Sequence, residues 1–227
     1  MLGIAIPAHD EEAHIAAAVR AAMAAGRHAA LGGEPCEVVV ALDACTDATG
    51  ELARAAGART VALDARNVGV ARALAAQALV EAGARWLAFT DADTRVAPDW
   101  LADQLALGAD AVCGCVAVDG WSGHGADAER LHAHFLATYN DRDGHRHIHG
   151  ANLGVSTALY LQVGGFKHLA CSEDVDLVRA IERTGARIAW SARPRVLTSA
   201  RRQARAVGGF ADALLQALAM PAGGVAA

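Results

Sequence analysis

The chain has 227 residues and a formal net charge of −5, so it is long enough for one α/β domain and has no general attraction for nucleic acid. Alanine raises the hydrophobic content to 54%, and only 4% of the residues are aromatic, which predicts slender, closely packed helices. The five cysteines contain no Cys-x-x-Cys pair, which argues against a disulfide framework and against a zinc ribbon.

Strands and helices alternate from the N-terminus. A short apolar strand over 2–6 is stopped by Pro7, and Asp10 is expected to cap the helix that follows. A second buried strand over 37–42 ends at another acid, Asp43. The next expected elements are a helix over 50–56, a strand over 60–63 and an Ala-rich helix that opens at 66–69 and reaches residue 82. This alternation predicts right-handed crossovers and an α/β fold with a mostly parallel, twisted sheet and helices on both faces, in three layers.

A fourth apolar strand, over 86–90, runs directly into Asp91 and Asp93. Parallel strands that are covered on both faces are almost continuously hydrophobic, and ligands of open α/β sheets bind at the carboxyl ends of the strands. Two carboxylates one residue apart at such an end suit a hard divalent cation, and Mg²⁺ usually completes its shell with water and phosphate oxygens. An isolated Asp-x-Asp is more often a pair of solvated turn acids, so the assignment depends on the rest of the chain.

The second half of the chain combines regular elements with one polar segment that has no periodicity. The elements expected there are helices over 99–107, 127–139, 157–163, 172 onward and 210–220, and strands over 111–118, 151–156, 187–190 and 195–198. Between them, residues 140–150 are polar and rich in histidine, without periodicity, which indicates a mobile loop at the active edge. His145, His147 and His149 either converge on a ligand or belong to a solvated surface loop.

Taken together, these residues resemble glycosyltransferases of family 2, which have the nucleotide-sugar-binding GT-A fold. The resemblance covers nearly the whole chain and rests on segments in a fixed order: residues 4–11 (IAIPAHDE), 38–47, 66–69 (RNVG), 89–94 (FTDADT) and 164–176. It implies one GT-A domain over 1–227, with a nucleotide-sugar-binding half over 1–120 and an acceptor-binding and catalytic half over 121–227.

The resemblance also implies roles for single residues. The nucleotide would be bound by Pro7, Ala8, Glu11, Asp43, Arg66, Asn67 and Asp91. Among these, Asp43 would accept hydrogen bonds from the base, and Asp91 would contact the ribose or the sugar. Asp93 would coordinate Mg²⁺ or Mn²⁺, and the ion would offset the charge on the departing nucleoside diphosphate.

For catalysis, the resemblance implies that Asp174 deprotonates the acceptor hydroxyl as it attacks the anomeric carbon, in a single displacement that inverts the configuration. Asn152, Glu173 and His149 are the expected acceptor-binding residues, with metal ligation as a further role for His149. Arg201 and Arg202 either bind the diphosphate or lie on an ordinary solvated helix face.

The chain departs from the family pattern at three places. Asp10 stands where the family usually has Asn, and Leu42 stands where an acid commonly precedes Asp43, so the base is not identified. The late histidine or Gln-x-x-Arg-Trp element of the family is missing, and residues 198–202 offer only Thr198, Ser199, Arg201 and Arg202 in its place.

Several alternatives remain open on the sequence. A sugar-1-phosphate nucleotidyltransferase shares the architecture, but residues 7–11 lack the glycines of its usual phosphate loop. A non-catalytic nucleotide- or sugar-binding module would lack the catalytic acid, and a retaining transferase has the same fold. The acceptor is not identified.

Location and assembly rest on weaker sequence features. No apolar run reaches the roughly 18 residues of a membrane-spanning helix and no leader is recognisable, so a cytoplasmic protein is expected. The apolar face of the last helix comprises Phe210, Leu214, Leu215 and Leu218. This face is expected on the core or in a homodimer, with peripheral attachment to the inner membrane surface as the alternative.

Overall fold

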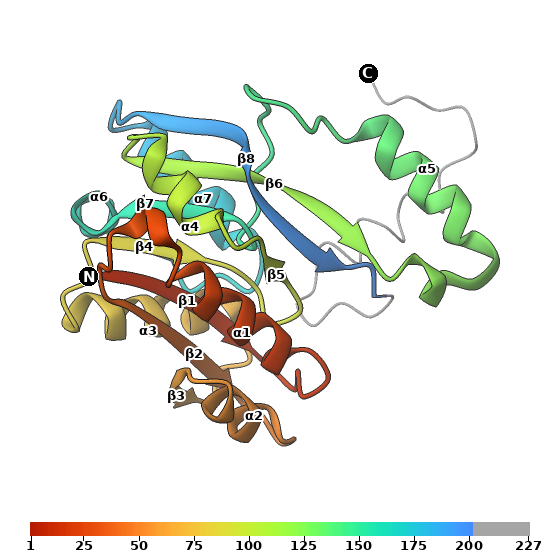
Figure 1. Cartoon of the computed structure of the whole chain (residues 1–227), viewed down its shortest axis with the longest axis horizontal. Coiled ribbons are helices and arrows are strands. Elements are labelled where there is room, and N and C mark those ends of the chain that lie inside the picture. Colours follow the sequence, from red (N-terminus) through yellow and green to blue (C-terminus); the bar gives the residue numbers. More distant parts are fainter. Residues whose placement is uncertain (202–227) are drawn as a thin grey trace.

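The computed structural model describes residues 1–201, which form one mixed sheet with helices on both faces (Figure 1). The strands of these residues are β1 (Leu2–Ala8), β2 (Cys36–Asp43), β3 (Arg59–Leu63), β4 (Trp86–Phe89), β5 (Arg95–Val96), β6 (Ala111–Asp119), β7 (Leu153–Ser156) and β8 (Ile188–Ser199). The helices are α1 (Ile15–Ala25), α2 (Thr49–Ala55), α3 (Val68–Glu81), α4 (Trp100–Ala106), α5 (Ala128–Thr138), α6 (Thr157–Gln162) and α7 (Glu173–Glu182), with 3-10 turns η1 (Ala29–Leu31) and η2 (Trp121–Asp127).

The sheet has the order β3-β2-β1-β4-β7-β6-β8-β5. Its first half is parallel, and Ile4 of β1 lies between Val38 of β2 and Ala88 of β4. In the second half β7 is antiparallel to both β4 and β6, while β8 runs parallel to β6. The predicted α/β architecture with helices on both faces is therefore confirmed, and its sheet is parallel on one side and mixed on the other.

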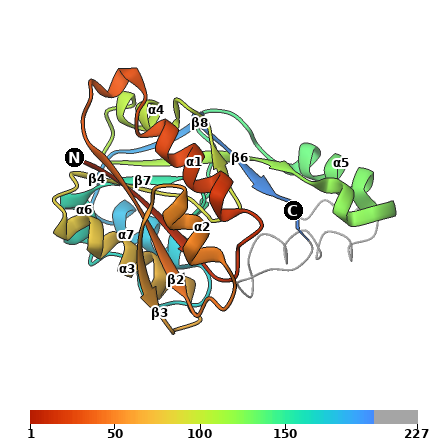
Figure 2. The ribbon, with the colours of Figure 1, turned by 60° about the horizontal axis from the view of Figure 1, so that its bottom comes forward.

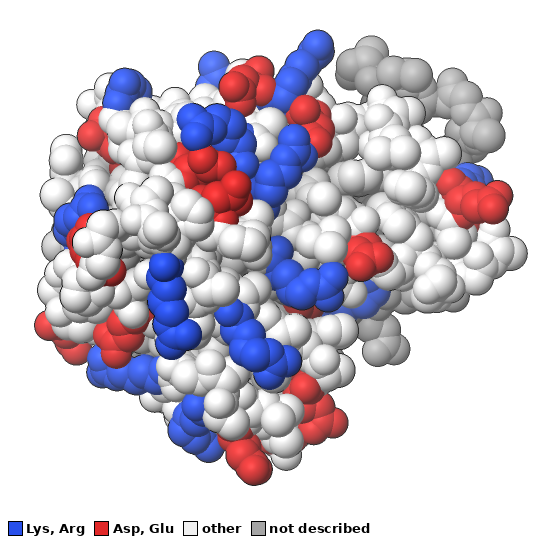
Figure 3. Space-filling view, in the orientation of Figure 1, with Lys and Arg blue, Asp and Glu red and all other residues white. Residues whose placement is uncertain are grey.

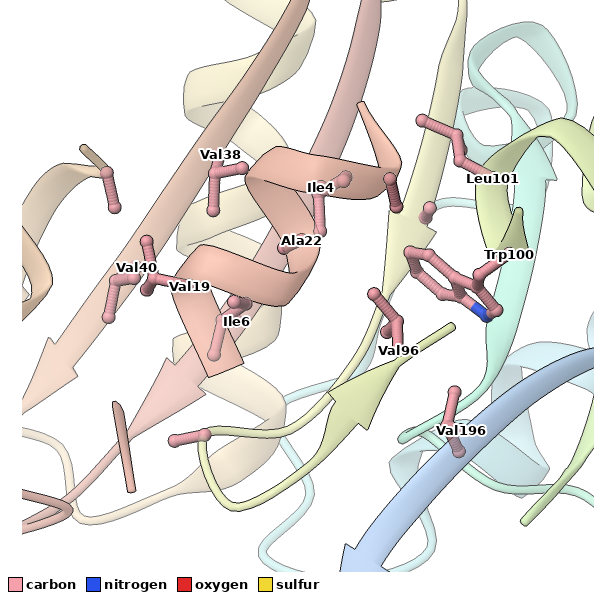
Figure 4. Close-up of a cluster of buried hydrophobic side chains, with 14 of the residues drawn as sticks. Ile4, Ile6, Val19, Ala22, Val38, Val40, Val96, Trp100, Leu101 and Val196 are labelled. Carbon is pink, nitrogen blue, oxygen red and sulfur yellow. The ribbon is translucent and has the colours of Figure 1, made fainter. Parts of the chain in front are cut away.

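Two buried clusters lie on the opposite faces of the sheet. Ile4 and Ile6 of β1 face α1, together with Val38 of β2, whereas the intervening Ala5 and Val39 face α3. Figure 4 shows the first cluster, in which the apolar stripe of α1 packs on β1 and β2, and Trp100, the first residue of α4, lies beside Val96 of β5. Successive side chains of a strand point to opposite faces, so strands that are covered on both faces must be apolar at every position.

Three elements differ from the sequence prediction. Helix α1 begins at Ile15, and Asp10 does not cap it: Asp10 has φ 50°, and its carboxylate accepts a hydrogen bond from the Thr46 backbone N–H (2.7 Å). The two-residue strand β5 was not predicted. The strands expected over 187–190 and 195–198 form one strand, β8, whose pairing with β6 skips from Ser191 to Arg195. Pro194 lies in this interruption, where its missing N–H breaks no ladder hydrogen bond.

The histidine-rich segment 140–150 has no regular secondary structure, as predicted, but its residues 141–146 contact β8. The carboxylate of Asp143 accepts hydrogen bonds from the Ser191 hydroxyl and the Ala192 N–H, both at 2.8 Å. The Gly144 N–H donates to the carbonyl of Trp190 (2.8 Å). The interpretation of this segment as a freely mobile loop is therefore not supported by its contacts.

At the far end of β6 and β8, η2 and α5 extend away from the other helices in both views (Figures 1 and 2). On the face shown in Figure 3, basic and acidic side chains are interspersed, and neither sign forms a continuous patch. None of the helices within residues 1–201 has the length and apolar character needed to span a bilayer. Arg202 and the helix predicted over 210–220 lie outside the described residues.

Candidate active site

The carboxyl ends of three adjacent parallel strands, β1, β2 and β4, meet at one edge of the sheet. Residues 9–12 follow β1, Asp43 ends β2, and Asp91 and Asp93 follow β4. The N-terminal ends of α3 and α7 and the last residues of β8 approach the same edge, as the contacts below show. Segments far apart in the chain thus bring most of the predicted site residues together.

Asp43 organises the first wall of this site. Its Oδ1 accepts hydrogen bonds from the Ala65 and Arg66 N–H groups (2.8 Å each), and its Oδ2 accepts one from Asn67 N–H (2.7 Å). The Asn67 side chain in turn caps α3 by accepting from Val70 N–H (3.1 Å). Asp43 therefore holds exposed Arg66, which has φ 48°, in the left-handed conformation beside the end of β2.

Replacing Asp43 is expected to destabilise the protein, because Asp43→Ala leaves three backbone N–H groups without their acceptor. We expect the free energy of unfolding to fall by about 2–4 kcal/mol, and by less for Asp43→Asn, which keeps one acceptor oxygen. Urea unfolding measures both. Asp64→Ala, at an exposed position in the same loop, is the control and is expected to change little. Equal stability of Asp43→Ala and wild type would contradict the role given to this carboxylate.

The loop after β1 is interlocked with the loop after β2. The Glu11 N–H donates to the Thr49 hydroxyl (2.7 Å), and the Glu12 N–H donates to Asp47 Oδ2 (3.1 Å). The backbone hydrogen bond from Thr46 lowers the pKa of Asp10. Half-buried Pro7 and buried Ala8 end β1 just before this loop. Together the two loops form a continuous wall on the β2 side of the site.

Glu11 and Asp93 share the guanidinium of Arg201. Arg201 Nη2 lies 3.2 Å from Asp93 Oδ2, and Arg201 Nη1 donates to Glu11 Oε1. Burial raises the pKa of Asp93 to about 6, against the opposing effect of Arg201 and with a further rise from Asp91 and Glu11. The Glu11 and Asp93 carboxylates are 4% and 9% exposed, and Arg201 supplies the positive charge between them. Arg201 therefore lies at the site and not on a solvated helix face.

Arg72 was not among the predicted site residues, yet it joins three segments of the site. Its side chain is 4% exposed and donates to Glu173 Oε1 (2.9 Å), the Gly150 carbonyl (2.9 Å) and Asp91 Oδ1 (2.6 Å). Burial raises the pKa of Glu173, and the charge of Arg72 opposes that rise. The sequence carried one indication, because Arg72 falls on the same side of α3 as the buried residues Ala75, Ala76 and Leu79.

Asp174 lies beside this group, half-buried at the start of α7. Its Oδ2 accepts a hydrogen bond from Gly150 N–H (2.7 Å), and its Oδ1 accepts one from Val175 N–H (2.8 Å). Ser172, with φ 61°, turns the chain into the helix just before it. Glu173 was expected to contact an acceptor, but its carboxylate is buried and paired with Arg72. The first acid of the pair is therefore buried in an ion pair, while the second is half-buried and held by two backbone N–H groups.

The histidines of segment 140–150 stack on one another. His147 is stacked on Tyr139 with ring centroids 4.2 Å apart, and His149 Nε2 lies 3.0 Å from the Tyr139 hydroxyl. Burial, together with His147 and His145, lowers the pKa of His149 to about 4, so its ring is neutral at pH 7. In residues 1–201, no three His, Cys, Asp or Glu side chains converge to hold a metal by themselves. His149 lies next to Gly150 and hence near Asp174.

Asn152 has a different place from the one expected. Its side chain is fully buried, accepts a hydrogen bond from Trp100 Nε1 (2.8 Å), and donates to the carbonyls of Cys115 (2.7 Å) and Pro194 (2.9 Å). These contacts fix α4, β6 and β8 to one another inside the protein. The prediction that Asn152 contacts an acceptor therefore does not fit the structure, because its polar atoms are hydrogen-bonded and none of them reaches the surface.

The chain is similar to known proteins of one family. A family model described as Glycosyl transferase family 2 matches residues 3–161. The S. aureus TarS 1-349 structure in complex with UDP-GlcNAc superposes with a TM-score of 0.67 at 15% identity, over 92% of this chain and 61% of that one. Mannosyltransferase PcManGT from Pyrobaculum calidifontis, in complex with GDP-Man and Mn²⁺, gives a TM-score of 0.63 at 19% identity, over 90% and 58%.

A third structure, M. tuberculosis glucosyl-3-phosphoglycerate synthase, gives a TM-score of 0.57 at 18% identity, over 99% of this chain and 83% of that one. No curated protein sequence matches the chain. The chain spans about three fifths of the length of the TarS and PcManGT structures. Identities this low show a common fold, and what those proteins bind does not by itself transfer to this one.

Proposed function

The chain belongs to glycosyl transferase family 2, and from this membership we propose that it transfers a sugar from a nucleoside-diphosphate sugar to an acceptor hydroxyl. The observation that carries the proposal is the set of carboxylates at the strand ends, Asp43, Asp91 and Asp93, with Asp174 at the helix end beside them. Two of the similar structures were solved with UDP-GlcNAc and with GDP-Man.

The nucleoside is proposed to bind between the loops after β1 and β2, against Pro7 and Ala8. A carboxylate has about four acceptor positions, and backbone N–H groups of residues 65–67 use three of those on Asp43. The remaining one suits a ring N–H of the base. Arg66, exposed at this wall, and Asn67 would flank the base or the ribose.

The diphosphate is proposed to bind at Asp93, with Mg²⁺ or Mn²⁺. The donor set is compatible with such an ion, because the carboxylates of Asp93 and Glu11, 9% and 4% exposed, both lie within reach of one cation, the guanidinium of Arg201, and are hard oxygen ligands. Magnesium commonly uses one or two protein carboxylates and takes its other ligands from water and phosphate oxygens, so a three-residue cage is not required. When bound, the ion would offset the negative charge that develops on the leaving diphosphate. Arg201 would bind a phosphate oxygen with the same guanidinium.

Asp174 is proposed as the general base. Its carboxylate is held by Gly150 N–H and Val175 N–H, so it is oriented before the acceptor arrives. A sugar or other hydroxyl is a poor nucleophile until its proton leaves, and Asp174 would take that proton as the oxygen attacks the anomeric carbon. Such a single displacement inverts the anomeric configuration. His149, neutral at pH 7 and next to Gly150, is the proposed acceptor contact. No described residue favours the nucleotidyltransferase or the binding-module alternative.

The donor site is tested by thermal unfolding in the presence of UDP, GDP, CDP or dTDP, each with manganese and with a chelator. A ligand at about 100 times its Kd adds about 2.7 kcal/mol to the stability of the folded state. For a protein of this size we expect one diphosphate to raise Tm by about 5–10 °C when manganese is present. The matching nucleoside monophosphate is the control and is expected to give a smaller rise. No rise with any of the four diphosphates would contradict the proposed function.

A further inference from the structure

Each nitrogen of the Arg72 guanidinium group contacts a different segment of the site. Nε donates to Glu173 at the start of α7, Nη1 to the carbonyl of Gly150, and Nη2 to Asp91 after β4. We propose that Arg72 is a positioning residue that holds the donor-binding Asp91 and the base Asp174 at a fixed separation. This inference rests on the proposed function, because it assigns Asp91 to the donor and Asp174 to the acceptor.

Arg72 acts on Asp174 by two routes. Gly150 is bound on both sides, since its carbonyl accepts from Arg72 (2.9 Å) and its N–H donates to Asp174 Oδ2 (2.7 Å). Glu173, the second route, precedes Asp174 directly in the chain and is held by Arg72 Nε (2.9 Å). A displacement of the guanidinium would therefore move the base together with the backbone that orients it.

The chemistry of the contact requires arginine. A guanidinium presents five N–H donors in a rigid planar fork, whereas a lysine ammonium is a single point charge on a flexible stem. The position is also closed to solvent, with Arg72 and Glu173 both buried. A Cβ atom on Gly150 would lie 2.4 Å from Arg72 Nη2, so the guanidinium fits only because residue 150 is glycine. A substitution of either Arg72 or Gly150 would therefore disturb the same contact.

The test compares Arg72→Lys and Gly150→Ala with Leu79→Ala. Arg72→Lys keeps the charge beside Glu173, and Gly150→Ala displaces the guanidinium without removing it. Leu79 is fully buried on the same helix and does not contact the site, so Leu79→Ala reports what a general destabilisation of α3 does. The measurements are kcat for release of nucleoside diphosphate from the donor sugar, with water as acceptor, and Kd for the nucleoside diphosphate.

We expect kcat to fall about 100-fold in Arg72→Lys and in Gly150→Ala, since a displacement of about 1 Å costs this much in a positioned reaction. We expect Kd for the nucleoside diphosphate to stay within about twofold, because the proposed base and diphosphate contacts, Asp43 and Asp93, are held by the N–H groups of residues 65–67 and by Arg201, whereas Arg72 holds Asp91, Gly150 and Glu173. Leu79→Ala, assayed below its Tm, is expected to keep its kcat. The same kcat loss in Leu79→Ala, or a wild-type kcat in Arg72→Lys, would overturn the inference.

A second readout does not depend on turnover. Hydrogen exchange of the Gly150 amide, which donates to Asp174, is expected to be at least tenfold faster in Arg72→Lys than in wild type, with the β1 amides unchanged. Unchanged Gly150 exchange would also overturn the inference. Failure of the proposed function is distinguishable, because it appears in the wild type as an absence of both nucleoside diphosphate binding and donor cleavage before any variant is compared.

Discussion

Asp174→Asn is expected to lower the rate of sugar transfer by about 10²–10⁴-fold, because general-base assistance is typically worth this much. Asparagine keeps the size of the side chain and one acceptor for the Gly150 N–H, so the start of α7 is expected to keep its structure. Donor binding is expected to remain, since Asp174 is not placed at the nucleoside or the diphosphate. The measurement is kcat alongside Kd for the nucleoside diphosphate.

Asp176→Asn is the matched control, because Asp176 lies in the same first turn of α7 and carries the same charge. It is expected to retain its activity. An equal loss of turnover in the two variants would mean that turnover depends on the negative charge at the start of α7 in general, and it would contradict the role of Asp174 as the general base. The anomeric configuration of the product gives an independent check, since retention would contradict the single displacement.

Asp93→Asn is expected to weaken manganese-dependent binding of the nucleoside diphosphate by on the order of 100-fold, because the variant would lose a ligand of the ion, and changes even to outer-shell partners of metal sites cost about 10–100-fold in metal affinity. In the presence of a chelator, the variant and the wild type are expected to bind the nucleotide equally. Titration calorimetry with and without manganese measures both affinities. An equal loss of affinity in chelator would remove the metal-ligand assignment from Asp93.

The stability of Asp93→Asn shows whether a loss of nucleotide binding comes from unfolding. Burial raises the pKa of Asp93 to about 6 from its ordinary value of 3.8, so between these values the folded state binds more protons than the unfolded state. The contribution of this group to stability is therefore lost as the pH rises toward 6. Asp93→Asn has no such ionisation and is expected to be at least as stable as the wild type at pH 7.5. Asp99→Asn, at an exposed position nearby, is the neutral comparison.

The order of the elements up to β4, and the strand ends at which the acidic residues lie, were predictable from the sequence alone. The apolar runs that became β1, β2 and β4 are continuous because helices cover both faces of these strands, and each run is followed by polar residues at the carboxyl edge. Asp43, Asp91 and Asp93 could be found in this way, because strand period and strand ends are local properties. The start of α3 was also predictable, since Asn67 is a strong capping residue.

Tertiary packing decided what each polar side chain does. Asn152 and Asp174 are both polar residues near Gly150, yet the side chain of Asn152 is fully buried with its polar atoms hydrogen-bonded, whereas Asp174 is half-buried. Arg72 joins Asp91, 19 residues away, to Glu173, 101 residues away. Arg201 lies 190 residues from Glu11. A local sequence pattern predicts which face of a helix is buried. The partner of a buried charge depends instead on which distant segments of the chain meet, and only the tertiary structure determines that.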